Sequence, residues 1–314
     1  MNLPAGHTVR PMRQEDAAVI AERSGAYTSA LLGFPKHSPE DVANYLRDPG
    51  MNLATDGWVV TGPGGEFAGS ATAVAITGGT HLNVDILSED PAILGWLLDQ
   101  IERRAAEVGS RTDREVVVRL GVIGQDERLA AAVAAHGFAV GTSTHRMRIT
   151  FDGPVPAPAV PDGVVVRRGA PDEASRRAAH AVLMAAFEAQ PGTQPRPFEE
   201  WAASRESRST FDWSQVTIAE VDGQAAGMTE CNDNFVSTDN CGYVGRLGVV
   251  PSARGRGLAK FLLRNAFAVD SAAGRGGTIL HVDTSNPTPA VALYTGAGMR
   301  PDLVSDIWTK TVRA

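Results

Sequence analysis

Residues 249–263, VVPSARGRGLAKFLL, decide the fold of the second half of this chain. The stretch leads from a predicted strand, residues 243–250, through Pro251 into a loop with two arginines and two glycines, residues 254–257. A predicted helix follows, because apolar side chains recur at helical spacing over residues 258–269. A strand that enters a glycine-rich loop and then a helix start is typical of a site that binds an anionic group.

The residue types of this loop explain why an anion would bind there. A helix start offers unpaired amide donors and the positive end of the helix dipole, glycines let the backbone approach a ligand closely, and arginines add charge-assisted hydrogen bonds. A pyrophosphate fits these requirements. The loop is not a Walker loop, because no Gly-Lys-Ser/Thr follows, and it is not the dinucleotide-binding fingerprint, because Lys260 stands where the third glycine would be. Taken alone, the loop leaves open the alternative of an ordinary glycine-rich turn with solvated arginines.

The segments on either side of this stretch predict a mixed α/β sheet. Residues 216–221 and 225–231 alternate as two strands, and Asp222-Gly223 supplies the hairpin turn between them. Residues 278–283 form a further apolar strand, and a helix follows over about residues 288–295. The order of elements is therefore a helical start, a hairpin, and then strand, helix, strand, helix and strand.

A proline-rich segment divides the chain into two parts. Residues 151–162, FDGPVPAPAVPD, carry four prolines, which impose extended backbone and remove amide donors. We expect this segment to be a linker between one domain of residues 1–150 and another of residues 163–314. The length of 314 residues agrees with two domains, since a domain has roughly 100 to 200 residues.

The two parts also end alike. Gly137-Phe138 and Gly298-Met299 each follow an alanine-rich helix and precede a final predicted strand, residues 144–149 in one case and 307–312 in the other. The separation of about 160 residues between the two ends is too long for a solenoid repeat. It indicates a duplicated domain.

Composition and charge exclude several classes of protein. The chain has 29 basic against 36 acidic side chains and a net charge of -7, so it lacks the basic footprint of a nucleic-acid-binding protein. No apolar run approaches the roughly 20 residues of a membrane helix, and residues 1–12 lack the apolar core of a signal peptide. Two cysteines, Cys231 and Cys241, cannot build a disulfide framework, and we therefore expect a cytoplasmic protein.

Two stretches, residues 249–263 and 279–299, together resemble the two signature motifs of the GNAT superfamily of acyl-CoA N-acyltransferases. In the first motif an Arg or Gln is followed, after two residues, by Gly and, after one more, by Gly or Ala. The second motif runs from an Asn to Leu-Tyr and then to a Gly followed by an apolar residue. The matching residues are Arg254, Gly257 and Ala259 in the first motif and Asn286, Leu293, Tyr294, Gly298 and Met299 in the second.

The resemblance implies an α/β chain of two tandem GNAT-like domains, each with a mixed, largely antiparallel central sheet flanked by helices. It also implies acetyl-CoA, or another acyl-CoA, as a cosubstrate of an active second domain, and no metal. A bulge in the strand before the loop would free a backbone amide, at Gly248 or Val249, that polarises the thioester carbonyl, and separation of this strand from the next would open a slot for the pantetheine arm. The residues expected to contact the coenzyme are Leu247, Gly248, Val249, Val250, Arg254, Gly255, Arg256, Gly257, Leu258, Ala259 and Asn286.

Tyr294 is the expected catalytic acid. In the family that the chain resembles, the tyrosine at this position commonly gives a proton to the departing thiolate, and an ordinary tyrosine pKa of about 10 suits a donor that stays protonated at neutral pH. Without the motif, the alternative is that Tyr294 is an aromatic residue of the core on an alanine-rich helix. Asn286 is similarly open to a role as a helix cap ahead of Pro287.

The base that would take the proton of the amine is less clearly marked. Glu230, at the end of the hairpin strand, is the candidate, and Asp233 and Asp239 in the loop that follows would attract a cationic amine. Solvated acidic side chains on a loop are the alternative. His281 and Asp283 lie on one face of their strand, and we expect a buried, paired histidine there rather than a catalytic dyad.

The first part of the chain lacks the residues of this site. Val133 stands where the second part has Tyr294, and residues 84–94, VDILSEDPAIL, contain no Arg-x-x-Gly pattern. Asp90-Pro91 predicts a helix cap, which is a poor partner for a pyrophosphate. We therefore expect residues 1–150 to form a degenerate GNAT-like domain that lends structure or one wall of the acceptor cleft.

Together these features predict an N-acetyltransferase that transfers an acetyl group from acetyl-CoA to the primary amine of a small molecule by direct attack on the thioester. We expect no nucleic-acid or membrane partner, and a monomer or a homodimer. Two alternatives remain: a noncatalytic acyl-CoA binding or regulatory protein built on the same fold, and an N-acetyltransferase that acts on proteins.

Overall fold

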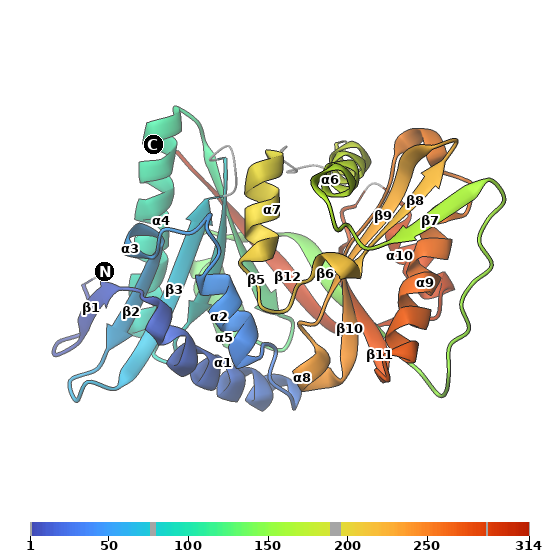
Figure 1. Ribbon diagram of the computed structural model, residues 1–314. Coiled ribbons are helices and arrows are strands. Elements are labelled where there is room, and N and C mark those ends of the chain that lie inside the picture. Colours follow the sequence, from blue (N-terminus) through green and yellow to red (C-terminus); the bar gives the residue numbers. More distant parts are fainter. Residues whose placement is uncertain (1, 76–79, 189–195, 287, 314) are drawn as a thin grey trace. The chain divides into compact units, whose positions relative to one another are not determined.

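A computed structural model of the chain describes residues 2–75, 80–188, 196–286 and 288–313. These residues form two compact units, one of residues 1–143 with 305–314 and the other of residues 144–304 (Figure 1). Each unit has a mixed, largely antiparallel sheet with helices packed on it, which confirms the predicted α/β class. None of the helices in the described ranges has the length and apolarity needed to cross a membrane.

The first unit is built on a sheet with the strand order β1-β2-β3-β4-β5-β12. Its pairs are antiparallel except for β4 and β5, which run parallel. The strands are β1 (Thr8–Pro11), β2 (Gly57–Thr61), β3 (Phe67–Ala75), β4 (His81–Leu87), β5 (Val116–Ile123) and β12 (Arg300–Val312). The helices are η1 (Gln14–Asp16), α1 (Ala17–Leu32), α2 (Pro39–Leu46), α3 (Leu53–Asp56), α4 (Pro91–Thr112) and α5 (Glu127–Ala135).

The second unit repeats this plan with the strand order β6-β11-β10-β9-β8-β7. Only β10 and β11 run parallel. The strands are β6 (Ala139–Thr150), β7 (Val164–Arg168), β8 (Val216–Val221), β9 (Gln224–Asn232), β10 (Cys241–Val249) and β11 (Gly277–Asp283). The helices are α6 (Glu173–Phe187), α7 (Phe198–Glu206), η2 (Trp213–Gln215), α8 (Val236–Asp239), η3 (Pro251–Ala253), α9 (Leu258–Ala272) and α10 (Ala290–Gly296).

The two halves of the sequence exchange their last strands. Residues 144–150 of β6 follow the first sheet in sequence, yet they pair antiparallel with β11 in the second unit. Residues 305–312 of β12 follow the second sheet in sequence, yet they pair antiparallel with β5 in the first unit. The compact units therefore differ from the expected division into residues 1–150 and 163–314. Local pattern marks both segments as strands, but it carries no information about which of two similar sheets each strand joins.

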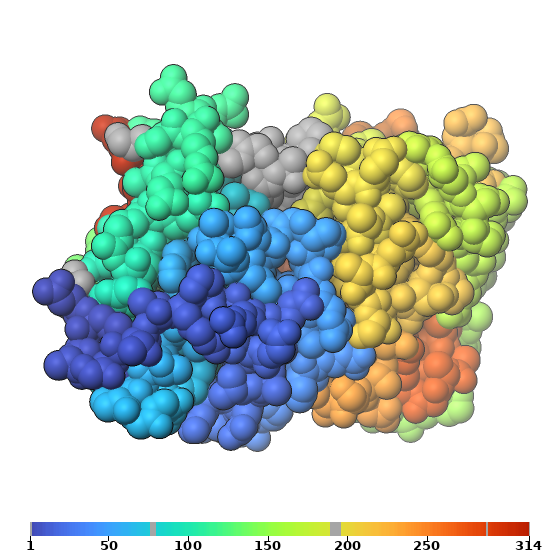
Figure 2. Space-filling view, turned by 60° about the vertical axis from the view of Figure 1, so that its left-hand side comes forward, coloured from blue at the N-terminus to red at the C-terminus, as the bar shows by residue number. Residues whose placement is uncertain are grey.

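Helix α4 covers the sheet of the first unit, where it packs against β3, β4 and β5. The carboxylate of Asp90 accepts hydrogen bonds from the amides of Ala92 and Ile93 at 2.7 and 3.2 Å, which confirms the predicted cap at the start of α4. The segment from β1 to α2, dark blue to blue in Figure 2, lies at the surface of this unit.

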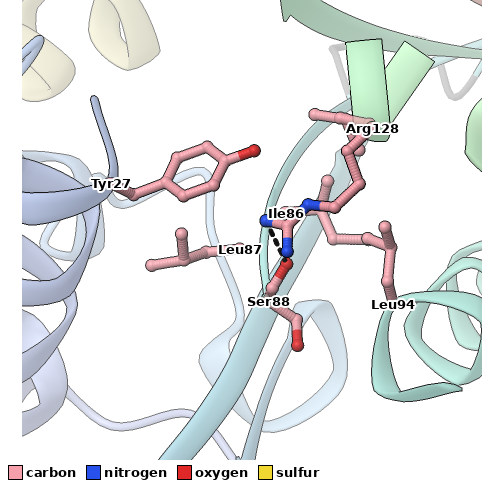
Figure 3. Close-up of a pocket in the computed structure, with 7 residues that line it drawn as sticks. Tyr27, Ile86, Leu87, Ser88, Leu94 and Arg128 are labelled. Atoms are coloured by element: carbon pink, nitrogen blue, oxygen red, sulfur yellow. Dashed lines mark hydrogen bonds between the residues drawn. The ribbon is translucent and has the colours of Figure 1, made fainter. Parts of the chain in front are cut away.

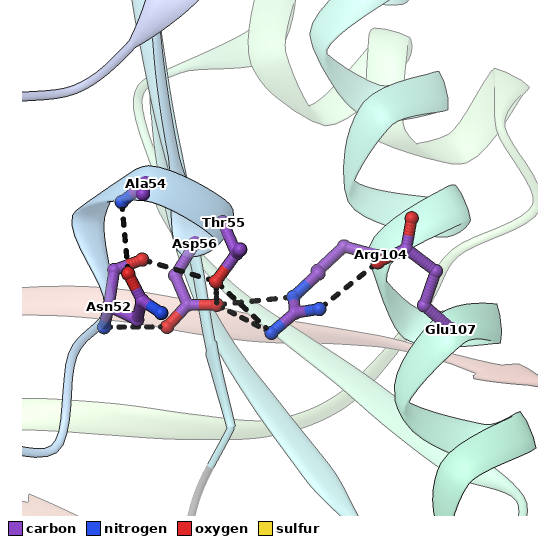
Figure 4. A network of polar contacts seen from close by, with 6 residues as sticks. All are labelled: Asn52, Ala54, Thr55, Asp56, Arg104 and Glu107. Atoms are coloured by element: carbon purple, nitrogen blue, oxygen red, sulfur yellow. Dashed lines mark hydrogen bonds and ion pairs between the residues drawn. The ribbon is translucent and has the colours of Figure 1, made fainter.

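A buried ion pair links α3 and α4 in the first unit (Figure 4). Asp56 accepts two hydrogen bonds from Arg104, at 3.1 and 2.8 Å, and both side chains are nearly buried. The second carboxylate oxygen of Asp56 accepts from the amide of Asn52 at 2.9 Å, and Arg104 also reaches the exposed Glu107 at 3.0 Å. This network satisfies both charges, because a buried charge without partners would be strongly destabilising.

Two helical layers cover opposite faces of the second sheet. A Cβ on Gly248 would meet the side chain of Ala186 in α6 at 3.0 Å, and a Cβ on Gly227 would meet Leu262 in α9 at 2.9 Å. Glycine at these two positions therefore lets both helices approach the sheet closely. We refer below to the α6 face and the α9 face of this sheet.

The predicted hairpin and helix of the second unit are confirmed. The strands β8 and β9 pair through a turn in which Asp222 and Gly223 have φ values of 51° and 75°, the positive values that a tight hairpin turn requires. Helix α9 covers the predicted apolar period, and Gly274 follows its end with a φ of 75°. These elements were predictable because their signals are local.

Candidate functional site

The loop between β10 and α9 has its backbone conformation set by two glycines. Gly255 and Gly257 have left-handed φ values of 77° and 79°, and nothing lies within 4 Å of the position that a Cβ would take on either residue. Gly257 is the N-cap of α9, and no side chain in the described part of the chain caps this helix. The first amides of α9 therefore keep their capacity to bind an anion.

The two arginines of this loop differ in their contacts. Arg254 donates a hydrogen bond from Nη2 to the carbonyl of Ala186 at 3.0 Å and one from Nε to the carbonyl of Val249 at 3.4 Å. It thereby ties the loop to the ends of α6 and β10. Arg256 is exposed beside the helix start. Both cations add positive charge to the loop that precedes α9.

Strands β10 and β11 separate beyond the middle of the second sheet. Their parallel pairing ends at Val244 and Leu280, although β10 continues to Val249 and β11 to Asp283. The pairing of β10 with β9 shifts register between Val244 and Arg246, which makes Gly245 the extra residue of a bulge. The expected separation of strands is present, and the bulge lies at Gly245, before the predicted positions Gly248 and Val249. We call the place where the two strands separate the fork.

The amide of Val249 faces this fork. Val250 donates its amide to the carbonyl of Ala226 at 2.9 Å, so the amide of Val250 points towards β9. Alternate residues of a strand point their amides to the same side, so Gly248 also faces β9, whereas Leu247 and Val249 face the fork. Of the two amides predicted to polarise a carbonyl, only that of Val249 therefore has the required direction.

Tyr294 lies on the α9 face beside the fork. The residue is 9% exposed, and its side chain packs in an apolar cluster with Leu263, Phe267 and Leu280. Burial, and to a smaller extent the neighbouring Tyr243, raises the pKa of Tyr294 to about 12. The hydroxyl therefore stays protonated at neutral pH, as a proton donor must. The burial of the ring fits a role in core packing as well.

Asn286 forms a turn ahead of α10. Its Oδ1 accepts hydrogen bonds from the amide and the hydroxyl of Thr288, at 3.0 and 2.7 Å. This contact caps the turn before the helix and agrees with the alternative role weighed from the sequence. Pro287 lies outside the described residues.

Glu230 belongs to a buried ion pair on the α6 face. The residue is 3% exposed, and its Oε2 lies 3.0 Å from Nε of Arg205 in α7. Arg205 also stacks over the ring of Trp201, 4.9 Å from its centroid, and burial lowers the pKa of the guanidinium to about 10. The sequence did not indicate Arg205, because the two partners are 25 residues apart and no local pattern joins them.

The acidic loop residues after β9 also have basic partners. Asp233 forms an ion pair with Arg275 and accepts from Gln215 at 2.8 Å. Asp239 accepts from Arg148 at 3.1 Å. Both charges have a basic partner within the unit, but the Asp233 side chain is still 44% exposed to solvent, whereas that of Asp239 is 12% exposed. Within the ranges that the structure describes, no group of three or more His, Cys, Asp or Glu residues is arranged to hold a metal ion.

His281 is exposed, so the expectation of a buried histidine is wrong. It follows Leu280, the last residue of β11 that pairs with β10, and its side chain points to the α6 face because side chains alternate along a strand. There its Nδ1 lies 3.1 Å from the hydroxyl of Tyr243. Asp283, the other residue of the supposed dyad, accepts from the amide and hydroxyl of Ser285 at 2.8 and 2.7 Å. The sequence could not indicate the contact with Tyr243, because it depends on the register between two strands.

The first unit has a similar separation of parallel strands, but different residues surround it. The parallel pairing of β4 and β5 ends at Val84 and Leu120, although both strands continue. Here the following helix, α4, is capped by the carboxylate of Asp90, which occupies the amides that an anion would need. Val133, the counterpart of Tyr294, is fully buried and has no proton to donate.

A small recess lies where β4 and β5 separate (Figure 3). Arg128 points into it and donates to the carbonyls of Glu89 and Ser88 at 2.5 and 3.4 Å. Tyr27 closes the other side, where its hydroxyl donates to Asp126. The residues that line the recess are Tyr27, Ile86, Leu87, Ser88, Leu94, Arg128 and Leu129.

Comparisons with known proteins agree with these features. Residues 179–299 match the model of the acetyltransferase (GNAT) family. A mycothiol acetyltransferase of Thermomonospora curvata is 34% identical to this chain over 54% of this chain and 55% of its own length. Another of Arthrobacter sp. is 31% identical over 56% and 54%. The chain thus matches about half the length of these curated relatives.

Solved structures extend the likeness to the whole chain. A GCN5-related N-acetyltransferase from Sphaerobacter thermophilus has a TM-score of 0.79 and 26% identity, and the match covers 100% of this chain and 98% of that one. A tandem GNAT protein from the clavulanic acid biosynthesis pathway has a TM-score of 0.72, and the match covers 97% of this chain and 98% of that one. At 20% identity, this likeness shows the fold alone. Residues 179–299 are therefore similar to the acetyltransferase (GNAT) family, and the chain as a whole has the fold of a tandem GNAT protein.

Proposed function

We propose that the second unit transfers an acetyl group from acetyl-CoA to the primary amine of a small molecule by direct attack of the amine on the thioester. The observation that carries this proposal is the continuity of the site. The fork between β10 and β11 leads along the inward-facing amide of Val249 into an uncapped helix start with two open glycines, Gly255 and Gly257.

The residues present fit the coenzyme. The amides from Gly255 to Ala259 would hold the pyrophosphate, and Arg256 stands beside them as an exposed cation. Leu247, Val249 and Val250 would line the path of the pantetheine arm along the edge of β10, with Asn286 at its other side. This edge offers both amides and carbonyls, because β11 has left it.

The chemistry needs three things from the chain. The amide of Val249 would donate to the thioester oxygen and stabilise the negative charge that develops there. As the bond from nitrogen to the carbonyl carbon forms and the bond from carbon to sulfur breaks, Tyr294 would give its proton to the sulfur. A base must take a proton from the amine, and Glu230 remains the residue predicted from the sequence. Its ion pair with Arg205 engages one carboxylate oxygen.

The name of these relatives, mycothiol acetyltransferase, supports acetyl transfer to a small molecule. The acetyltransferase family model covers the loop, the fork and Tyr294. We draw the reaction class from these relatives. The acceptor is left as a small primary amine.

The binding half of this proposal is tested by Gly257→Glu, with Gly274→Glu as its matched control. Both glycines have a similar positive φ, 79° and 75°, and open space around them, so the backbone strain introduced is alike. Only Gly257 lies at the start of α9, where an added carboxylate would repel a phosphate. Titration calorimetry of the full chain with acetyl-CoA should show affinity at least about tenfold weaker for Gly257→Glu than for Gly274→Glu. Equal affinities would mean that the coenzyme does not bind at this loop.

A further inference from the structure

His281 and Tyr243 form a hydrogen-bonded pair beside the fork, on the face of the sheet opposite Tyr294. We propose that His281 is the residue that accepts the proton of the amine, and that the Tyr243 hydroxyl positions its ring. This inference rests on the proposed function, because it names the base for that reaction. It differs from the sequence-based candidate, Glu230.

The first argument is access. A base must reach the amine within hydrogen-bond distance or through one water molecule. His281 is exposed, whereas Glu230 is 3% exposed and lies 3.0 Å from Arg205. Proton transfer to Glu230 would leave Arg205 as a buried cation without its partner, which is costly.

The second argument is position. His281 is the next residue after Leu280, so it stands where β11 leaves β10. The neighbouring side chains on β11, Leu280 and Val282, pack with Tyr294 on the α9 face. Because side chains alternate, His281 lies on the α6 face. The base and the acid would thus act at one fork from opposite faces, one on the nitrogen that attacks and the other on the sulfur that leaves.

The third argument is orientation of the ring. The Nδ1 of His281 lies 3.1 Å from the Tyr243 hydroxyl, and the Tyr243 ring meets the imidazole edge on, with centroids 5.6 Å apart. Phe235 packs against both rings, at 5.1 Å from Tyr243 and 6.0 Å from His281. When Nδ1 carries the hydrogen and donates it to Tyr243, the basic lone pair of the ring is on Nε2.

Several charged groups face this histidine. Arg146 on β6 lies directly across the strand pair from it, and Arg146 is bound by Asp302 through two hydrogen bonds of 2.8 Å. Asp239 on α8 lies 3.9 Å from Arg146 and also binds Arg148. Asp283 lies on the same strand and the same face, and Tyr243 faces the ring from β10. The pH profile of His281→Gln is therefore compared with that of Tyr243→Phe, which changes a neighbour of the ring and keeps the imidazole.

The reaction needs no further reagent, because one proton leaves the amine nitrogen and one proton is given to the sulfur. The amine nitrogen forms its bond to the carbonyl carbon while His281 takes one proton from that nitrogen. The carbon to sulfur bond then breaks, and Tyr294 gives its proton to the sulfur. Solvent carries the proton from the imidazolium back to the tyrosinate, which restores both residues and leaves the amide and free coenzyme A.

The test compares four variants of the full chain, His281→Gln, Tyr243→Phe, Glu230→Gln and the control His145→Gln. His145 lies on the adjacent strand β6 opposite Val282, so it belongs to the other face of the sheet. Wild-type chain and acetyl-CoA are first assayed with a panel of polyamines, amino sugars and amino acid amides, by thiol release and product mass. The pH profile of kcat/KM for the best amine and the affinity for acetyl-CoA are then measured for each variant.

We expect His281→Gln to lower kcat/KM by about 10²- to 10⁴-fold and to abolish the acidic limb of its pH profile. The affinity for acetyl-CoA should change less than about threefold, and Tyr243→Phe should cost about tenfold while keeping the acidic limb. His145→Gln should match the wild type. If a His281 variant loses stability in thermal unfolding, His281→Ala with added imidazole replaces it, and recovery of the rate by imidazole is the supporting result.

Two other outcomes overturn the inference, and they differ from each other. An active wild type with an equally active His281→Gln, or with an acidic limb that disappears in Glu230→Gln instead, contradicts the role of His281 and leaves the proposed function intact. A wild type that releases no thiol with any amine of the panel contradicts the proposed function and this inference together.

Discussion

Trp308 lies opposite Leu120 in the antiparallel pair of β12 and β5, so the last strand of the chain completes the sheet of the first unit. Met147 lies opposite Leu280 in the pair of β6 and β11, so the last strand of the first part completes the sheet of the second. Each unit therefore contains a strand from the part of the sequence on the other side of the linker, and neither sheet is complete without that strand. The stability of each unit depends on residues that a division at the linker would assign to the other.

Trp308→Ala should weaken the first unit and not the second. The indole packs against the core of the first unit, and its removal should cost about 2 kcal/mol of unfolding free energy, less than for a fully buried tryptophan. Hydrogen exchange should accelerate in Val116–Ile123, the strand that β12 pairs with. Exposed Thr311 on the same strand supplies the control, Thr311→Ala, which should leave exchange unchanged. Faster exchange in Gly277–Asp283 instead would contradict the pairing.

Cleavage of the linker should not separate the two fragments. A protease site placed within residues 156–160 cuts between β6 and β7, after which one fragment carries β6 and the other carries β12. Each fragment would still hold a strand in the sheet of the other, as β6 does with β11 and β12 with β5. Gel filtration of the cleaved protein in native buffer should show one peak that contains both fragments. Two separate folded fragments would show that the strands are not exchanged.

The sequence predicted the elements of the second unit because their signals are local. A helical period marked α9, Asp222-Gly223 marked the hairpin, and Asp90-Pro91 marked the cap of α4. Each of these signals lies within a few residues of the structure that it specifies, so it needs no knowledge of the partners in space.

The exchange of strands and the partners in the site were not predictable in this way. The segments 144–149 and 307–312 have similar patterns, and either one could complete either sheet. The pair of Glu230 and Arg205 and the pair of His281 and Tyr243 depend on tertiary packing and on strand register. The exposure of His281 likewise follows from its place at the end of a strand pairing, which no local pattern reveals.

Arg104→Met should strongly destabilise the first unit. It leaves the nearly buried carboxylate of Asp56 without its cation, and breaking a buried ion pair in this way costs about 3 kcal/mol or more. Glu107→Ala removes a partner of the same arginine that is 57% exposed, so its cost should stay under about 1 kcal/mol. Denaturant unfolding of both variants measures the difference. A double variant, Arg104→Met with Asp56→Asn, should recover part of the loss, because no charge is then buried alone.

Tyr294→Phe tests the proposed acid and separates an enzyme from a binding protein. The change keeps the ring in its apolar cluster and removes the proton. General acid catalysis contributes about 10²- to 10⁴-fold, so kcat should fall in that range while the affinity for acetyl-CoA changes less than about threefold. Since no hydrogen bond of the hydroxyl is found among the described residues, the stability at neutral pH should change by less than about 1 kcal/mol.

The pH dependence of stability provides an independent check on the same residue. Burial raises the pKa of Tyr294 to about 12 from an ordinary value of 10.0, so the folded state favours the protonated form. The resulting contribution to stability is fully present below pH 10 and is lost as the pH rises towards 12, and Tyr294→Phe removes this loss. The difference in unfolding free energy between wild type and variant should therefore shift in favour of the variant above pH 10.

A Tyr294→Phe variant that transfers acetyl groups at the wild-type rate, under conditions in which chemistry limits turnover, would show that Tyr294 serves packing and that water or the substrate protonates the thiolate. A broad panel of amines without any transfer, together with tight binding of acetyl-CoA, would favour a noncatalytic binding protein.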